Sequence, residues 1–136
     1  IVNEETETTS YFEIPSFINK DTQSTVESLK DKNLNIVLIG EGNKIIKQYP
    51  IKNSILNTND KLFLVTNGNE YKYTNIENWS RNDLEIYGNL LGVTFNFNGY
   101  GYAINTNLNN QIVSKGQTID INLNSKYIED NSTNNS

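Results

Sequence analysis

The chain carries the same pattern twice, and this repeat limits its possible folds more than any other feature. Residues 34–42 read Leu-Asn-Ile-Val-Leu-Ile-Gly-Glu-Gly, and residues 93–101 read Val-Thr-Phe-Asn-Phe-Asn-Gly-Tyr-Gly. Both segments alternate apolar and polar residues, end in a Gly-x-Gly turn and precede another alternating segment, at 61–65 and 118–123. The offset is 59 residues at first and 57 in the last segment, which two single-residue deletions explain. The repetition indicates a pair of duplicated small domains.

Each copy also has a helix signal before its first alternating segment. In the first copy Asp21 is the predicted N-cap, the helix runs to about Lys32, and Asn33 ends it in a left-handed turn. In the second copy Ser80 is the N-cap and Gly92 the stop. The apolar positions that define the helix faces are Val26 and Leu29 in the first copy, and Leu84, Tyr87, Leu90 and Leu91 in the second.

These signals predict an α+β fold with two tandem small domains, each with one helix packed on a three-stranded antiparallel sheet. The predicted strands are 11–14, 34–39, 44–48 and 61–65 in the first domain, and 93–97, 103–106 and 118–123 in the second. The predicted organisation is a linker at 1–10, a first domain at 11–66, a connector at 67–72, a second domain at 73–125 and a disordered tail at 126–136.

The composition excludes several kinds of site. The chain has no Cys and no His, so disulfides, a zinc site and a His-based catalytic triad are excluded, and no metal or cofactor is predicted. The net charge is −5 and no basic stripe occurs, which argues against nucleic acid as a partner. No segment has the length of a membrane span. The chain begins at Ile1 rather than Met, so we expect a fragment without membrane contact, anchored by other parts of its parent.

The order of these elements resembles the PASTA domain family. The residues that carry the resemblance are 14–17, 34–42, 45–50 and 59–62 in the first copy, and 79–83, 90–93, 97–99 and 114–117 in the second. The second copy departs from the family at Thr74 and Leu108, where the family has Pro. Together the copies cover residues 14–124, and the second copy looks like the type found at the C terminus of staphylococcal class B penicillin-binding proteins.

This resemblance implies a noncatalytic extracellular module, located at the outer face of the membrane or in the cell wall. The module would recognise the wall and position a transpeptidase in septal peptidoglycan synthesis and cell division. The implied partners are peptidoglycan stem peptides or muropeptides, the transpeptidase domain of the same chain, and division proteins. Two alternatives stay open: a purely structural or protein-interaction module, and the extracellular sensor repeats of a membrane Ser/Thr kinase.

The chain itself shows no enzymatic chemistry, and four residues are candidates for ligand binding. No Ser-x-x-Lys element of a transpeptidase occurs in the sequence. Trp79 could stack on a sugar face or a β-lactam ring, or pack as a hydrophobic staple on the helix that follows it. Arg81 could pair with a stem-peptide carboxylate or remain a solvated helix-start residue. Tyr100 and Tyr102, which flank Gly101, could face a ligand or cover the neighbouring repeat.

Overall fold

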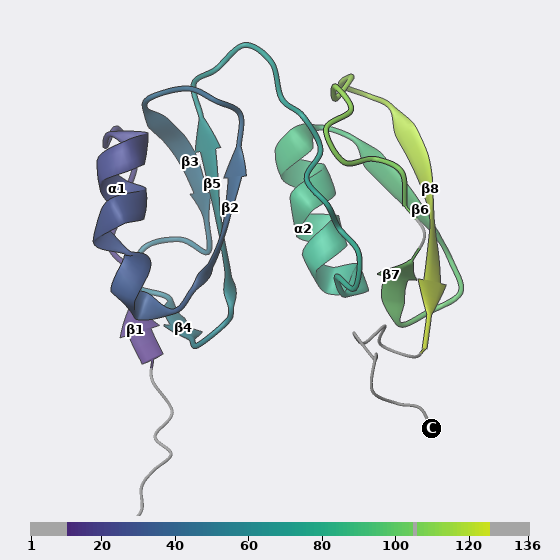
Figure 1. Ribbon diagram of the computed structural model, residues 1–136, viewed down its shortest axis with the longest axis horizontal. Helices are drawn as coiled ribbons and strands as arrows, with labels where there is room; N and C mark the ends of the chain where they lie inside the picture. The colour runs from purple at the N-terminus through teal and green to yellow at the C-terminus, as the bar shows by residue number, and fades with distance from the viewer. Residues whose placement is uncertain (1–10, 105, 126–136) are drawn as a thin grey trace, which may run out of the picture. The chain divides into compact units, whose positions relative to one another are not determined.

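The computed structural model describes residues 11–104 and 106–125 (Figure 1). The predicted linker at 1–10 and tail at 126–136 lie outside the described residues, as does position 105 of the predicted strand at 103–106. The chain divides into two compact units, with the boundary between Asn69 and Glu70. Helices and small sheets occur in both units, so the α+β class is confirmed. Within the described ranges, no helix has the length and apolar character needed to cross a bilayer.

The first unit is built on a three-stranded sheet and a separate two-stranded one. Its elements are β1 (Tyr11–Glu13), α1 (Thr22–Ser28), the short 3-10 helix η2 (Lys30–Lys32), β2 (Asn35–Ile39), β3 (Ile45–Tyr49), β4 (Ile55–Asn57) and β5 (Lys61–Thr66). The larger sheet has the order β2-β5-β3, and β1 pairs with β4. The strand β4 was not predicted from the sequence.

The second unit has a longer helix and one three-stranded sheet. Its elements are α2 (Arg81–Leu91), β6 (Thr94–Asn98), β7 (Tyr102–Ile104) and β8 (Thr118–Asn124). The order of the sheet is β6-β8-β7, so the last strand of the unit again lies in the middle. Figure 1 shows α2 running along one face of this sheet.

The prediction that both sheets are antiparallel is wrong. The pair β2 and β5 is parallel, as is the pair β6 and β8, and only β3 and β7 run antiparallel to the central strand. The reason is the place of the last strand. The chain reverses direction twice between the first and last strands of each sheet, so these two strands point the same way. Because the last strand lies between the other two, one of its neighbours is parallel and the other antiparallel.

Both helices begin at the predicted caps. The carboxylate of Asp21 accepts a hydrogen bond from the backbone N–H of Ser24 at 2.9 Å, and this bond lowers the pKa of Asp21 below its usual value. In the second unit the Ser80 hydroxyl accepts from the N–H of Asp83 at 3.2 Å. In each case the side chain satisfies one of the donors that the first helical turn leaves without an intrahelical partner.

The helix ends are also those expected from the sequence, with one difference. Asn33 and Gly92 both adopt the left-handed conformation, with φ of 56° and 78°. The first α-helix is shorter than predicted, because it ends at Ser28 and the chain continues to Lys32 as a 3-10 turn. Ser and Thr inside this helix are weak helix formers, which is consistent with its early end.

The core of the first unit joins the helix, the two-stranded pair and the sheet. Its buried members are Ile14, Phe17, Leu29, Ile45, Leu56, Leu62 and Leu64. The central strand β5 is buried along the whole of residues 62–66, as is typical of a strand covered on both faces. Phe63 and Val65 of β5, with Val37 and Ile39 of β2, form a second apolar and buried face of the same sheet.

The core of the second unit lies between α2 and its sheet. Leu84, Tyr87 and Leu91 are buried on the helix, three of the four positions predicted for its apolar face, and the fourth, Leu90, is half-buried. The rings of Tyr87 and Phe95 stack with their centroids 6.4 Å apart. This packing fixes α2 on β6 and so determines the geometry of the surface between them.

Candidate functional site

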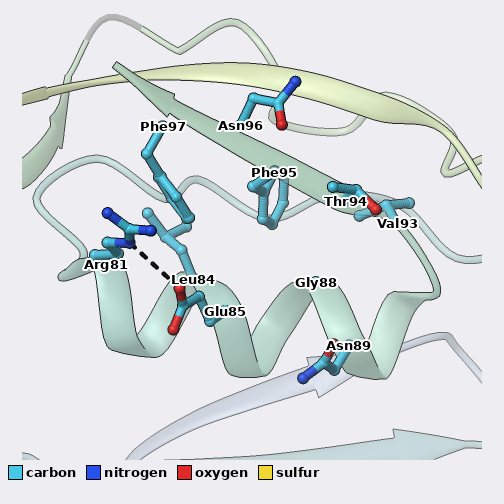
Figure 2. Close-up of a pocket in the computed structure, with 10 residues that line it drawn as sticks. All are labelled: Arg81, Leu84, Glu85, Gly88, Asn89, Val93, Thr94, Phe95, Asn96 and Phe97. Atoms are coloured by element: carbon cyan, nitrogen blue, oxygen red, sulfur yellow. Dashed lines mark hydrogen bonds and ion pairs between the residues drawn. The ribbon is translucent and has the colours of Figure 1, made fainter. Parts of the chain in front are cut away.

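A shallow groove runs between α2 and β6 on the surface of the second unit. Its volume is about 430 Å³. Figure 2 shows the helix on one side and the side chains of β6 on the other. The lining residues that bear on its chemistry are Arg81, Glu85, Gly88, Asn89, Phe95 and Phe97. The groove therefore has an aromatic floor and polar groups from both the helix and β6, where Thr94 and Asn96 also line it.

The helix and the strand supply these groups through their ordinary periodicities. Arg81, Glu85 and Asn89 follow one another at four-residue intervals, so they share one face of α2. Phe95 and Phe97 are two residues apart on β6, and Figure 2 shows both rings pointing toward the helix. The aromatic floor and the polar rim are thus consequences of two sequence patterns placed side by side.

Gly88 allows the helix to approach the strand closely. It is buried in the middle of α2, and a Cβ at this position would lie 3.1 Å from Cδ2 of Phe95 and 3.2 Å from the carbonyl oxygen of Val93. Any larger residue would push the helix and the Phe95 ring apart. A glycine inside a helix lowers helix stability, so its presence here has a packing reason.

Two contacts orient the guanidinium of Arg81 at one end of the groove. Its Nε donates to Oε2 of Glu85 at 3.2 Å, an i,i+4 ion pair on the surface of the helix. Its central carbon lies 4.7 Å from the centroid of the Phe97 ring, within range of a cation–π interaction. An arginine held in this way presents a planar array of N–H donors, which suits a carboxylate ligand.

Trp79 lies beneath the start of α2 and is largely buried. Its side chain is 9% exposed, and its ring meets that of Tyr87 edge-on with centroids 5.0 Å apart. Its backbone carbonyl accepts a hydrogen bond from the N–H of Ala103 in β7 at 3.0 Å. This burial favours the packing interpretation of Trp79 over the stacking platform for a ligand. The printed aromatic contact of Trp79 is with Tyr87 of the helix that follows it.

The two tyrosines occupy the same end of the unit as Arg81 but differ in exposure. Tyr100 lies in the turn after β6 and is 76% exposed. Tyr102 begins β7, and its backbone forms an antiparallel bridge with Ser80, the N-cap of α2. The fold therefore places Tyr102 beside the start of the helix that carries Arg81, and leaves Tyr100 projecting from the adjacent turn.

The first unit has a groove at the corresponding place but with different chemistry. This groove has a volume of about 410 Å³ and lies between α1 and the end of β2. Its apolar surface comes from Val26 and Leu38, and its polar groups include the carboxylates of Asp21, Glu27 and Glu41. At the offset of the repeat, Thr22 stands where the second unit has Arg81. Both units thus have a groove beside the helix, but the groove of the first unit is lined by carboxylates and lacks a counterpart of Arg81.

Glu85, Asn89, Phe95 and Phe97 line the groove but were not predicted as site residues. The four-residue spacing from Arg81 identifies Glu85 and Asn89 as its neighbours on the helix face. Phe95 and Phe97 alternate on a predicted strand, and their side-chain direction toward the helix follows once the polar residues between them are assigned to the outer face. The spacing of these residues could therefore have been read from the sequence. That this strand packs against this helix depends on the tertiary fold.

Tyr87 makes the stability of the second unit dependent on pH in the alkaline range. Burial raises the pKa of its hydroxyl from 10.0 to about 12, although the oxygen accepts a hydrogen bond from the N–H of Thr74 at 2.8 Å. The folded state favours the neutral hydroxyl. Its contribution is thus complete below pH 10 and is lost as the pH rises toward 12, by about 2 to 3 kcal/mol. Guanidinium unfolding at pH 8 and pH 11.5, followed by Trp79 fluorescence, measures the loss.

The variant Tyr87→Phe separates this effect from general alkaline denaturation. Phenylalanine cannot ionise, so we expect a smaller loss of stability between pH 8 and pH 11.5. At pH 8 the variant is expected to be about 1 kcal/mol less stable, because the N–H of Thr74 loses its acceptor. An equal alkaline loss in the two proteins would contradict the assignment to Tyr87.

Comparison with known proteins finds a family match within the first unit. The PASTA domain matches residues 12–68, which confirms the resemblance found in the sequence for the first copy. Among solved structures, penicillin binding protein 2X from Streptococcus thermophilus superposes with a TM-score of 0.71 and 20% identity, over 84% of this chain and 17% of that one. The extracellular region of the Ser/Thr kinase PrkC from Staphylococcus aureus gives a TM-score of 0.36 and 14% identity, over 85% and 47%. A search of curated proteins finds no match.

Proposed function

We propose, from the PASTA match of residues 12–68, that this chain is a noncatalytic extracellular module of a penicillin-binding protein. The observation that carries the proposal is the similarity to penicillin binding protein 2X, which extends over 84% of the chain and so includes both units. The module consists of two tandem PASTA-type domains, at residues 11–66 and 73–125, joined by a short connector. Its role is to recognise peptidoglycan and to position the attached transpeptidase in septal wall synthesis.

The noncatalytic role agrees with the side chains that the sequence provides. Without His or Cys, a nucleophile would need a Lys or carboxylate as its base. The Arg81 groove is open and shallow, and its charged groups are already paired with each other. Such a surface suits weak recognition of a ligand rather than bond cleavage.

The ligand group that the groove fits best is a carboxylate attached to a short peptide. The guanidinium of Arg81 provides the donors, and the rings of Phe95 and Phe97 provide an apolar surface for the rest of the ligand. Stem peptides of uncrosslinked peptidoglycan have this chemistry. Tyr100, in the turn at the same end of the unit, extends the proposed surface, and Trp79 supports the helix start from below. Tyr102 lies at the same end but in register with the exposed Asn124, on the sheet face away from α2.

Replacing Arg81 with alanine is expected to weaken the binding of a soluble muropeptide about tenfold. A hydrogen bond to a charged group contributes about 1.5 to 3 kcal/mol, and 1.4 kcal/mol corresponds to a factor of ten. Titration of the 136-residue chain with muropeptide, followed by NMR chemical shifts, gives both the affinity and the residues perturbed. We expect the perturbed residues to include Arg81, Glu85 and Phe97.

Lys115→Ala is the matched control for this experiment. It removes one positive charge from the same unit at the other end of α2, where the Lys115 side chain lies near Gly92. Muropeptide binding by this variant should equal that of the wild type. If a saturating concentration of muropeptide shifts no NMR resonance of the chain, wall recognition is excluded. The purely structural module would then be the remaining interpretation. Equal weakening in the two variants would reveal a nonspecific charge effect.

A further inference from the structure

The chain contains two Asn-Gly pairs, Asn67-Gly68 and Asn98-Gly99, which share one chemistry but have different surroundings. An asparagine followed by glycine is open to an intramolecular reaction, in which the backbone nitrogen of the glycine attacks the side-chain carboxamide. Glycine favours this attack, because it has no Cβ to block the approach and its backbone adopts many conformations. The surroundings of each pair therefore decide whether it reacts.

Backbone contacts of the first unit hold Asn67 directly after the central strand β5. The N–H of Asn67 donates to the carbonyl oxygen of Lys44 at 3.0 Å, and the carboxamide oxygen Oδ1 of Asn67 accepts from the N–H of Lys44 at 3.2 Å. The second bond polarises the carboxamide and places a donor where negative charge develops when its carbon, Cγ, is attacked. Asn67 is thus an oriented and activated electrophile.

The turn at Gly42 brings this carboxamide and the nitrogen of Gly68 to one place. A Cβ on Gly42 would collide with Oδ1 of Asn67 and lie 2.5 Å from the nitrogen of Gly68, so both atoms border the space that the glycine leaves empty. The buried hydroxyl of Thr66 accepts from the N–H of Gly42 at 2.9 Å and fixes the turn against the end of β5. Within the described part of the chain, the N–H of Gly68 donates to no acceptor. The nucleophile is therefore close to the electrophile and not occupied.

The pair Asn98-Gly99 lacks this arrangement. Asn98 is the last residue of β6 and is in register with Asn122 of the parallel strand β8. Its carboxamide nitrogen donates to Oδ1 of Asn122 at 3.4 Å, which directs the group across the sheet rather than along the chain toward Gly99. Among the described residues, no N–H donates to the oxygen of this carboxamide. The molecule thus contains its own matched comparison.

We propose that Asn67-Gly68 is a site of self-modification by deamidation, promoted by the fold of the first unit. Hydroxide removes the proton from the nitrogen of Gly68, which then bonds to Cγ of Asn67, and the charge on Oδ1 is stabilised by the N–H of Lys44. The Cγ–Nδ2 bond breaks, and ammonia leaves after taking a proton from water. A second water opens the resulting succinimide ring at either of its two carbonyls, which yields aspartate or isoaspartate.

The reaction irreversibly changes the charge and the shape of the turn beside Gly68. Either product adds a carboxylate near Glu41, whose backbone nitrogen lies 3.2 Å from the position of a Cβ on Gly68, and lowers the net charge of −5 by one. Isoaspartate also leads the main chain through Cγ, so Lys44 loses its Oδ1 acceptor. Glu41 and Gly42 line the groove of the first unit, which becomes more acidic. The modification needs no ligand and is independent of the Arg81 groove.

Peptide mapping by mass spectrometry, during incubation of the full chain at pH 8, measures both pairs in one sample. We expect Asn67 to convert at least about tenfold faster than Asn98, since one hydrogen bond to a developing charge is worth that factor. In guanidinium, where the folded surroundings are lost, the two rates should become similar. Equal rates in the folded chain, or faster conversion of Asn98, would overturn the proposal.

Two variants test the chemistry of the site. Gly68→Ala shields the attacking nitrogen and should slow conversion of Asn67 severalfold, with no effect on Asn98. Lys44→Ala is the control: it removes an exposed side chain but keeps the backbone N–H, so the rate at Asn67 should not change.

The products give a readout that does not depend on how the variants fold. Attack by Gly68 produces isoaspartate as well as aspartate at position 67, whereas direct hydrolysis of the carboxamide produces aspartate alone. Isoaspartate at position 67 of the wild-type chain is therefore expected. Aspartate without isoaspartate, or an unchanged rate in Gly68→Ala, would exclude the proposed reaction.

Discussion

Replacing Gly101 with alanine is expected to destabilise the second unit by about 4 kcal/mol, an amount comparable to the whole stability of a unit this small. Gly101 has φ of 111°, in the region that L side chains rarely adopt. A Cβ there would collide with the backbone of Asn124 and lie 2.7 Å from Cα of Ser125. Because the obstacle is backbone at the end of the central strand, no rotamer change relieves it. Guanidinium unfolding followed by Trp79 fluorescence measures the loss.

Gly116→Ala is the control that separates steric collision from backbone strain. Gly116 also has positive φ, 81°, but a Cβ built on it meets no atom within 4 Å. This variant should lose only about 1 to 2 kcal/mol, the penalty of a left-handed residue. Similar losses in the two variants would show that the collision at Gly101 is relieved by movement of the turn.

Leu64→Ala is expected to remove about 3 kcal/mol from the stability of the first unit. Leu64 is fully buried, belongs to the core that joins α1 to the sheet, and lies on β5 between both neighbouring strands. The shortened side chain leaves a cavity that a central strand cannot close by moving. Because this unit has no Trp, hydrogen exchange of the amides at 36–39 and 45–49 is the measurement, and their protection should fall more than a hundredfold.

Leu38→Ala gives the comparison on the neighbouring strand. Leu38 is 43% exposed and borders the groove of the first unit, so its truncation should lower stability by less than 1 kcal/mol. Protection of the same amides should change little. Equal loss of protection in Leu64→Ala and Leu38→Ala would contradict the placement of Leu64 at the centre of the core.

The helix ends could be predicted because their causes lie within a few residues. The cap at Asp21 needs only the N–H of Ser24, and the left-handed conformation at Asn33 or Gly92 needs only a residue that tolerates positive φ. The strands of the larger sheets were recognisable for the same reason, since the alternation of side chains is local. What the sequence shows about these elements is their position and their exposed side.

Strand order depends on distant partners, and here the sequence prediction failed. Each sheet was predicted to be antiparallel, but the last strand inserts between the first two in both units and runs parallel to one of them. The continuous apolar run at 62–65 is the one signal for a central strand in the first unit. The strand β4 was missed because it has three residues in an Asn-rich loop, and its pairing with β1 alone reveals it.

The candidate site was partly visible in the sequence. Arg81 was chosen for its place in the first helical turn, and the structure puts it on a groove beside Glu85 and Phe97. The sequence left two interpretations of Trp79 open, because burial depends on Tyr87 approaching from the helix. The role of Trp79 in ligand binding stays a prediction, as do the roles of Arg81, Tyr100 and Tyr102.

The central place of the final strand determines how such a unit can be shortened or copied. Truncation from the C-terminal side removes the middle of the sheet first and leaves two edge strands with no partner between them. A gene segment that ends before this strand therefore encodes a unit that cannot form its sheet. Duplication must carry the whole segment, after which the two copies are free to acquire different surfaces.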